Sequence, residues 1–183
     1  MRPRGFTLVE LLVGLAIFAF LLMIATPTMI QFMGNSRIRN TADSLAAGLR
    51  QAQVEALKRN RDVQFIVNPA VGWRINDPDP VLGGPVQDEP FSTGATVTVT
   101  AVPPGTTTVV YSGLGQYRPD GTAGAPPAPG PVQRLRVTSS TMTSPHDLEV
   151  IVDPALGVGV RVCDPQFSNA AADPVKAAIG CPP

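Results

Sequence analysis

The first 33 residues constrain the fold most, because they join a short basic leader to a long apolar run that contains one carboxylate. Arg2 and Arg4 precede Phe6, and apolar residues then continue to about Ala25 with Glu10 as the one charged side chain. Burying a charge in lipid costs at least about 2.5 kcal/mol, so a charged residue in a membrane-spanning helix usually has a function. Glu10 is therefore the first candidate functional residue, and it needs a positively charged partner.

Two ordinary explanations of this segment compete. A secretory signal peptide has an apolar region of about 7–15 residues and then a cleavage site, but here apolar residues continue as far as Met33. A plain membrane anchor needs about 20 apolar residues, which fits the length but leaves Glu10 unexplained. The basic pair before the run favours a cytoplasmic N-terminus in either case.

A third explanation comes from the hexapeptide Gly5-Phe6-Thr7-Leu8-Val9-Glu10, which resembles the processing site of type IV pilins and pseudopilins. The resemblance implies that a prepilin peptidase cleaves after Gly5, that Phe6 becomes the N-methylated N-terminus, and that Glu10 pairs with the amine of a neighbouring subunit. It implies a single-pass protein of the bacterial inner membrane, with a cytoplasmic N-terminus and a periplasmic head. The implied partners are the major pilin, other minor pilins or pseudopilins, the peptidase and the inner-membrane assembly platform.

The apolar pattern beyond the run predicts that one helix continues from about Thr7 to Arg59, a length of about 80 Å at 1.5 Å per residue. Apolar residues recur at steps of three and four, which places them on one helix face that should pack on the head. They are Ile38, Ala42, Leu45, Leu49, Ala52 and Ala56. The opposite face carries Arg39, Asp43, Arg50 and Gln53. Asn60 is the expected helix stop, and Pro27 and Gly34 should weaken or bend the helix.

The remainder of the chain alternates short apolar runs with Gly- and Pro-rich turns, which is typical of a small β-rich domain. The expected strands are 63–67, 73–75, 96–100, 108–111, 134–137, 148–152 and 158–162. We predict an α+β fold in which the long helix packs on antiparallel sheet. Phe65 and Trp73 should be core residues, and Gly121–Pro131 a mobile loop within the head.

A narrower resemblance is carried by the helix end and by later turns. Asn35-Ser36-Arg37-Ile38-Arg39, and the Ala-rich stretch Ala46–Asn60, are similar to the GspH/FimT branch of minor pilins. Tyr111–Gly115 followed by Pro119-Asp120-Gly121 looks like the family's glycine-bearing strand and turn. The sequence around Cys163, with Cys181 near the end, resembles FimT-like pilus proteins in particular.

An exported head would lie in an oxidising compartment, which favours a disulfide between Cys163 and Cys181. The bridge would close a loop of about 19 residues and stabilise the fold by roughly 3 kcal/mol in the chain-entropy model. Metal binding is the alternative, but two cysteines and His146 cannot alone form a closed zinc site. These expectations divide the chain into a leader (1–5), a transmembrane and assembly helix (6–33), an amphipathic helix (34–61) and a β-rich head (62–183) that ends in a disulfide loop.

The resemblance implies a minor pilin that takes part in pilus assembly, with a GspH-like pseudopilin of a type II secretion system as the alternative. Some FimT-like proteins bind DNA through a Gly-Arg-x-Arg motif before the first C-terminal cysteine. The matching positions here are Val158, Gly159, Val160 and Arg161, so one of the two arginines is missing. Losing a phosphate-contacting cation weakens such binding, although Arg134, Arg136 and Lys176 offer other contacts.

Composition argues against other classes. Lys plus Arg and Asp plus Glu both number 14, so no global charge attracts nucleic acid. The basic segment Arg37–Arg61 is expected to be a solvated helix face. His146, the one histidine, lies in a loop-like stretch without a nucleophile motif, which disfavours an enzyme. Asp77, Asp79, Asp88 and Glu89 fall in turn-rich segments and are expected to be solvated, and no cofactor is predicted.

Overall fold

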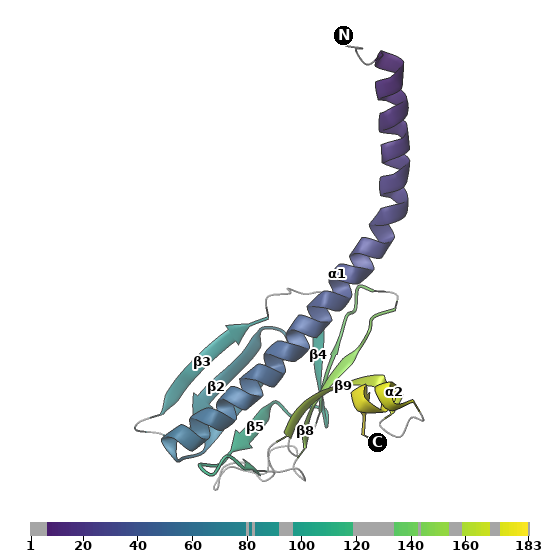
Figure 1. Ribbon diagram of the computed structural model, residues 1–183. Helices are drawn as coiled ribbons and strands as arrows, with labels where there is room; N and C mark the ends of the chain where they lie inside the picture. Colours follow the sequence, from purple (N-terminus) through teal and green to yellow (C-terminus); the bar gives the residue numbers. More distant parts are fainter. Residues whose placement is uncertain are drawn as a thin grey trace, which may run out of the picture.

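One long helix runs from the N-terminus into a head built of two sheets (Figure 1). The computed structural model describes residues 7–79, 81, 83–91, 97–118, 134–142, 144–153, 159–168 and 173–182. Within these residues the helix is α1 (Leu8–Arg59), and each sheet has five strands. The predicted α+β fold, with a long N-terminal helix packed on largely antiparallel sheet, is thus confirmed.

The ends of α1 follow from local capping. Thr7 is the N-cap residue, and its hydroxyl accepts a hydrogen bond from the Glu10 N–H at 3.2 Å. At the other end Asn60 adopts the left-handed conformation (φ 52°), and its N–H bonds to the carbonyls of Ala56 and Leu57. The helix therefore begins one residue after the predicted start and stops at the residue that was predicted to stop it.

The helix changes direction between two segments. Leu8–Ile24 and Met29–Arg59 meet at 41°, so the bend lies in the interval that contains Pro27. Gly34 lies inside the second segment, where it serves a different purpose. A Cβ at this position would lie 2.2 Å from the Met142 sulfur, so Gly34 allows the loop after β7 to approach the helix closely.

The apolar stripe of the second segment is buried as predicted. All six of its members are fully inaccessible to solvent: Ile38, Ala42, Leu45, Leu49, Ala52 and Ala56. The prediction was wrong for Gln53, which is only 9% exposed. Its side-chain amide donates to the Gly115 carbonyl at 2.8 Å, and this hydrogen bond explains why a polar residue is tolerated inside.

The first sheet has the strand order β3-β2-β1-β5-β6. Its strands are β3 (Gly84–Pro90), β2 (Gly72–Asp77), β1 (Val63–Asn68), β5 (Thr108–Tyr111) and β6 (Tyr117–Arg118). The second sheet has the order β10-β9-β8-β7-β4. Its strands are β10 (Gly180–Cys181), β9 (Gly159–Ser168), β8 (Leu148–Asp153), β7 (Arg134–Thr138) and β4 (Thr98–Val102). All pairs are antiparallel except β9 with β10.

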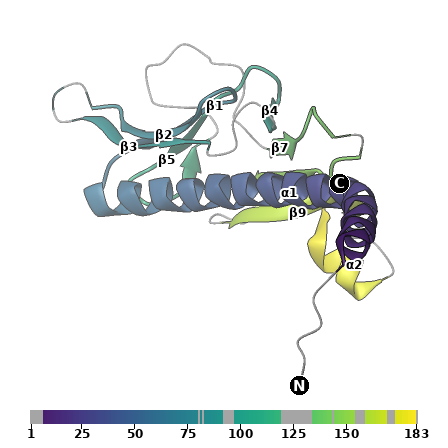
Figure 2. The same cartoon turned by 90° about the horizontal axis from the view of Figure 1, so that it is seen from above.

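The second half of α1 packs against both sheets. Figure 2 shows β1, β2, β3 and β5 on one side of the helix and β9 on the other. Phe65 and Trp73 are buried as predicted, with ring centroids 5.4 Å apart. A Cβ on Gly48 would lie 2.7 Å from the Phe65 ring and 2.9 Å from the Trp73 ring. A glycine is therefore needed where the helix contacts these two rings.

The glycine-bearing turn of the predicted family motif packs on the end of α1. A Cβ on Gly113 would lie 2.5 Å from the Asn60 carbonyl carbon, so only glycine fits against this backbone. Gly115 has φ 74°, a Cβ at this position would lie 3.0 Å from the Leu57 side chain, and its carbonyl accepts the Gln53 hydrogen bond. The described part of the motif, Tyr111–Gly115, thus forms a turn that packs on the helix terminus.

Four elements were not predicted: β3, β6, the short helix α2 (Pro174–Ile179) and β10. β3 lies at a sheet edge, where Pro85 and Pro90 do not interrupt a central ladder. β4 runs from Thr98 rather than from Thr96, which lies outside the described residues together with Val158, Pro119-Asp120-Gly121 and the loop to Pro131.

Candidate functional site

The N-terminal half of α1 presents apolar side chains on every face. Between Leu8 and Met33 the large apolar residues outside 25–28 are each 50–79% exposed. Glu10 is also exposed in the first helical turn, while Gly5 and Phe6 lie outside the part of the chain that is described. Judged by length and composition, no single described helix qualifies as a membrane span, but Leu8–Ile24 and Met29–Arg59 qualify as a bent pair. An apolar surface of this kind indicates a segment that is covered by lipid or by other chains.

The outer face of the second sheet brings the candidate DNA-contacting arginines together. Strand register places Arg134 opposite Ile151 and Ile151 opposite Arg161. The next row on the same face joins Arg136, Glu149 and Cys163. Side chains in register across neighbouring strands share one face of a sheet, so the three arginines from β7 and β9 lie on the same face as Glu149.

Glu149 is a buried carboxylate that compensates two of these arginines. Its side chain is 3% exposed, and its Oε1 accepts hydrogen bonds from Arg136 Nε at 2.8 Å and Nη2 at 2.6 Å. Arg134 lies 3.7 Å from the other carboxylate oxygen. Because a buried carboxylate needs compensation, both guanidinium groups are held by the fold before any phosphate approaches.

The remaining two candidate cations are engaged near the C-terminus. Arg161 donates to the carbonyls of Ala178 at 2.8 Å and Gly180 at 3.2 Å. The exposed Lys176 ammonium lies 5.9 Å from the centre of the Phe167 ring. The structure therefore brings all four predicted cations to one side of the head, where the three arginines have hydrogen-bond partners and Lys176 lies over an aromatic ring.

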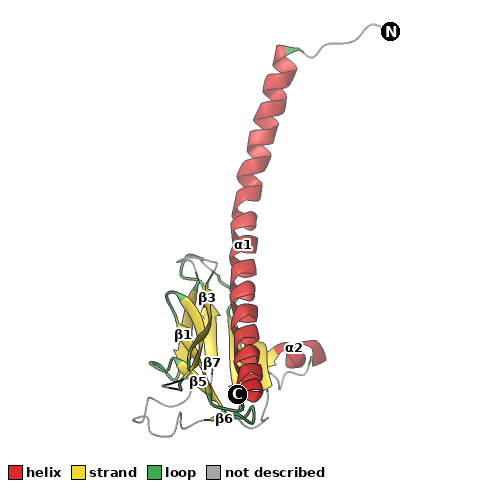
Figure 3. Cartoon of the chain, turned by 90° about the vertical axis from the view of Figure 1, so that its left-hand side faces the viewer, coloured by secondary structure: helices red, strands yellow, loops and turns green. Residues whose placement is uncertain are grey.

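The C-terminal segment, defined as residues 173–182, is fastened to β9 at several points. Cys163 and Cys181 form the expected disulfide, with Cα atoms 5.1 Å apart. Arg161 holds the end of α2, and Arg134 donates to the Pro182 carbonyl at 3.3 Å. Figure 3 shows α2 on the side of α1 away from the first sheet. The sequence does contain a signal for α2, because Asp173 caps the helix and Pro174 occupies its first turn.

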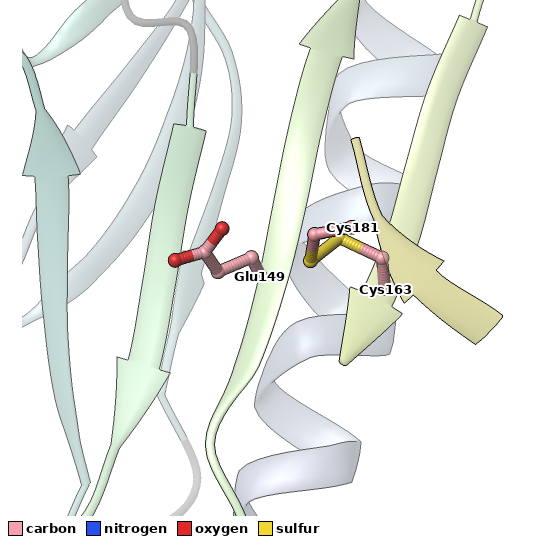
Figure 4. Close-up of side chains that lie close together, drawn as sticks. All are labelled: Glu149, Cys163 and Cys181. Carbon is pink, nitrogen blue, oxygen red and sulfur yellow. A yellow bond between two sulfur atoms is a disulfide. The ribbon is translucent and has the colours of Figure 1, made fainter. Parts of the chain in front are cut away.

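Glu149, Cys163 and Cys181 also bring three potential metal-ligand atoms within 4.8 Å of one another. Figure 4 shows the carboxylate beside the two sulfur atoms, which are bonded to each other. A disulfide offers no thiolate ligands, and thiolates are what zinc requires of cysteine. The chemistry of this group therefore favours the disulfide over the metal alternative.

A groove of about 610 Å³ lies where α1 leaves the head. We call it the neck groove. Its lining includes Phe32 of α1, Leu148 of β8, Val162 of β9 and Ile179 of α2. His146 lines it as well, and its Nε2 lies 2.7 Å from a carboxylate oxygen of the buried Asp164. Its backbone N–H also donates to Asn35 of α1, so the histidine connects the helix to β9.

Some of the acidic residues that were expected in solvated loops form ion pairs instead. Asp77 is 2% exposed in its side chain and lies 3.3 Å from Arg59, so the prediction was wrong for this residue. Asp79 pairs with Arg61 at 2.9 Å. Asp88 and Glu89 lie on β3, not in a loop. The hydrogen bond from Arg59 lowers the pKa of Glu55, and the bond to Glu55 raises the pKa of Arg59. These contacts hold the end of α1 and form no catalytic arrangement.

Two comparisons of the sequence with known families give the same class. The family described as type II transport protein GspH matches residues 41–155, and the prokaryotic N-terminal methylation motif matches residues 1–26. A crystal structure of the type IV minor pilin FimU from Pseudomonas aeruginosa matches with a TM-score of 0.49 and 14% identity, covering 72% of this chain and 91% of that one. No curated protein sequence matches.

The long exposed helix, the helix-centred head and the methylation motif define a pilin-like structural subunit. More specifically, the chain belongs to the GspH family. It is accordingly a GspH/FimT-like minor pilin or pseudopilin, of a type IV pilus or of a type II secretion system.

Proposed function

We propose that this chain is a minor subunit of a type IV pilus, incorporated through its N-terminal helix and exposing its head and C-terminal segment to other subunits. We favour a type IV pilus over a type II secretion system because of the segment 173–182. This segment is attached to β9 by the Cys163–Cys181 disulfide and by hydrogen bonds from Arg161. A cysteine pair at these positions is the feature in which the sequence resembles FimT-like pilus proteins.

The proposed pathway to the fibre follows from the N-terminal motif. A prepilin peptidase cleaves after Gly5, and the new Phe6 amine is methylated. Residues 6–33 then cross the inner membrane once, leaving residues 34–183 in the periplasm. Glu10 pairs with the Phe6 amine of a neighbouring subunit, where low dielectric surroundings strengthen the attraction between opposite charges.

Intact mass of the membrane-extracted protein tests the processing step. The expected mass corresponds to loss of Met1 to Gly5 and gain of one methyl group. A protein that still begins at Met1, or that has been cut near Ala25, would refute it. A Gly5→Val variant is the control, because it should remain uncleaved while leaving the head unchanged.

Composition of purified fibres tests the choice of machine. We expect to find the subunit in sheared type IV pili. We also expect the number of pili to fall when its gene is deleted. Recovery with secretion pseudopilins, together with lost protein secretion and normal pili, would favour the GspH-like pseudopilin instead.

DNA contact is a second candidate function, because Arg134, Arg136, Arg161 and Lys176 lie on one side of the head. Of these, Arg136 keeps a half-exposed side chain despite its bonds to Glu149. If it contacts phosphate, Arg136→Gln should weaken duplex DNA binding and lower the salt dependence by about one counterion. Arg74→Gln, on the other sheet, is the matched control, and equal affinities for both variants would exclude this contact.

A further inference from the structure

The wall that α1 contributes to the neck groove changes from apolar to polar to charged along the helix. Phe32 comes first, Asn35 and Ser36 follow, and Arg39 and Asp43 come last. At 1.5 Å per residue, Arg39 lies about 10 Å beyond Phe32 along the helix axis, and Asp43 lies about 6 Å beyond Arg39. The groove is therefore amphipathic, and its charged part lies farther along α1 than its apolar part.

Two charges in this wall are not engaged by the protein. Among the residues that the structure describes, neither Arg39 nor Asp43 has a hydrogen bond or an ion pair, and both are exposed. The second carboxylate in the groove, that of Asp164, accepts a hydrogen bond from the Gln166 N–H and lies 2.7 Å from His146 Nε2. The groove thus offers a ligand one cation and, one helical turn farther on, one anion.

We propose that the neck groove binds a phospholipid whose headgroup carries both a phosphate and an ammonium group, with Arg39 on the phosphate and Asp43 on the ammonium. A guanidinium group binds phosphate oxygens in a fork, and a carboxylate accepts charge-assisted hydrogen bonds from an ammonium group. In such a lipid the acyl chains, the phosphate and the ammonium follow one another in the same order as Phe32, Arg39 and Asp43 follow along α1. Phe32 and Ile179, which are 72% and 45% exposed, offer apolar contacts to the start of the acyl chains.

The place of the groove along the chain favours a lipid as its occupant. Phe32 lies at the end of the exposed apolar surface that begins at Leu8, and the proposed membrane-crossing segment ends at residue 33. The headgroup layer adds about 5–7 Å to each side of the hydrocarbon core. Helical side chains point toward the N-terminus, so the long Arg39 side chain extends back toward this layer. The inference therefore rests on the membrane crossing that is part of the proposed function.

Native mass spectrometry of the membrane-extracted protein in mild detergent tests the site. Phosphatidylethanolamine and phosphatidylglycerol with the same acyl chains are added at equal concentrations. Phosphatidylethanolamine should be retained as a single adduct with about tenfold preference, because the glycerol headgroup lacks the ammonium group that Asp43 binds. Equal retention of the two lipids, or a preference for phosphatidylglycerol, would overturn the proposal.

Variants of the two charged residues test their separate roles. Arg39→Gln should weaken retention of both lipids by about tenfold, and Asp43→Asn should remove the preference between them. The double variant Arg39→Asp with Asp43→Arg keeps the net charge but reverses the order of the charges, so it should also lose the preference. Lys58→Gln and Asp88→Asn are the matched controls, because each removes one charge from a residue outside the groove. Equal effects in the controls and in the groove variants would contradict the assigned contacts.

A soluble competitor distinguishes a membrane lipid from a free phosphodiester. Glycerophosphoethanolamine carries the same two charges without acyl chains, so it should displace phosphatidylethanolamine only at about a hundredfold excess or more. Displacement at equal concentration would overturn the lipid as the occupant.

The outcomes also separate this inference from the proposed function. A subunit that is present in pili but shows no selective retention would overturn the lipid site alone. A subunit that retains phosphatidylethanolamine but is absent from pili would defeat the pilus role alone. A protein that is not recovered with the membrane fraction would defeat both.

Discussion

The two halves of α1 use similar apolar residues in opposite ways. From Leu8 to Met33 the large apolar side chains outside 25–28 are at least half exposed, whereas the stripe from Ile38 to Ala56 is completely buried against strands of both sheets. In the first half apolar residues surround the helix, and in the second they occupy one face. The two halves of one helix therefore differ in role: the second half stabilises the head, and the first half leaves an apolar surface for lipid or other chains to cover.

The largest expected effect on stability comes from the buried half. Leu49→Ala should lower the free energy of unfolding of the head by about 2–5 kcal/mol, because it leaves a cavity in a closely packed core. Leu12→Ala removes the same atoms from an exposed site and should leave the head unchanged. Chemical denaturation of both variants in detergent checks the contrast, and equal losses would show that the halves are not independent.

The disulfide should matter next, and only to the head. Replacing Cys163 and Cys181 by alanine should cost roughly 3 kcal/mol for a closed loop of this length. The far-ultraviolet signal of α1 should survive, because the bridge joins elements of the second sheet. Retention of full stability in the double variant would show that Arg161 and Arg134 hold the C-terminal segment without it.

Two glycines of the same helix give a finer comparison. Alanine has the higher helix propensity by about 1 kcal/mol, so Gly14→Ala should be neutral or stabilising where nothing lies within 4 Å. Gly48→Ala should instead destabilise by about 1–3 kcal/mol, because the added carbon meets the Phe65 and Trp73 rings. The melting temperatures of the two variants test this contrast, and a higher melting temperature for Gly48→Ala would contradict the close contact.

The smallest effect is a pH dependence confined to the head. Burial raises the pKa of Tyr117 from 10.0 to about 12, and burial also raises the pKa of Tyr111. A raised pKa favours the protonated folded form, so this contribution to stability is complete below pH 10 and is lost as pH rises through about 12. Spectrophotometric titration should show tyrosinate forming late, and ionisation of both tyrosines near pH 10 in the folded protein would contradict it.

The sequence predicts the helix and the stripe well because both depend on local capping and on a repeating pattern. The six buried stripe residues could be named from their spacing, and Asn60 from its residue type after a basic pair. The burial of Gln53 and Asp77 could not, since it depends on Gly115 and Arg59, which reach them only through the fold. β3 was hidden by prolines and acidic residues that an edge strand tolerates.

The candidate site shows the same division. The cysteine pair is visible in the sequence, and so are the four cations. The ion pairs of Arg134 and Arg136 with Glu149, which follow from strand register, and the hydrogen bonds of Arg161 to the C-terminal segment are not. The neck groove also needs Phe32 and Ile179 to meet, although 147 positions separate them in the chain.

The most direct test of the division within α1 compares Glu10→Ala with Glu55→Ala. Each variant loses one carboxylate from the same helix, and the quantity measured is the amount of subunit in sheared fibres relative to its amount in the membrane. We predict that Glu10→Ala is cleaved, inserted and folded as stably as the wild type but is lost from fibres. Glu55→Ala should be incorporated normally. Wild-type incorporation of Glu10→Ala, or a destabilised head in that variant, would contradict the account.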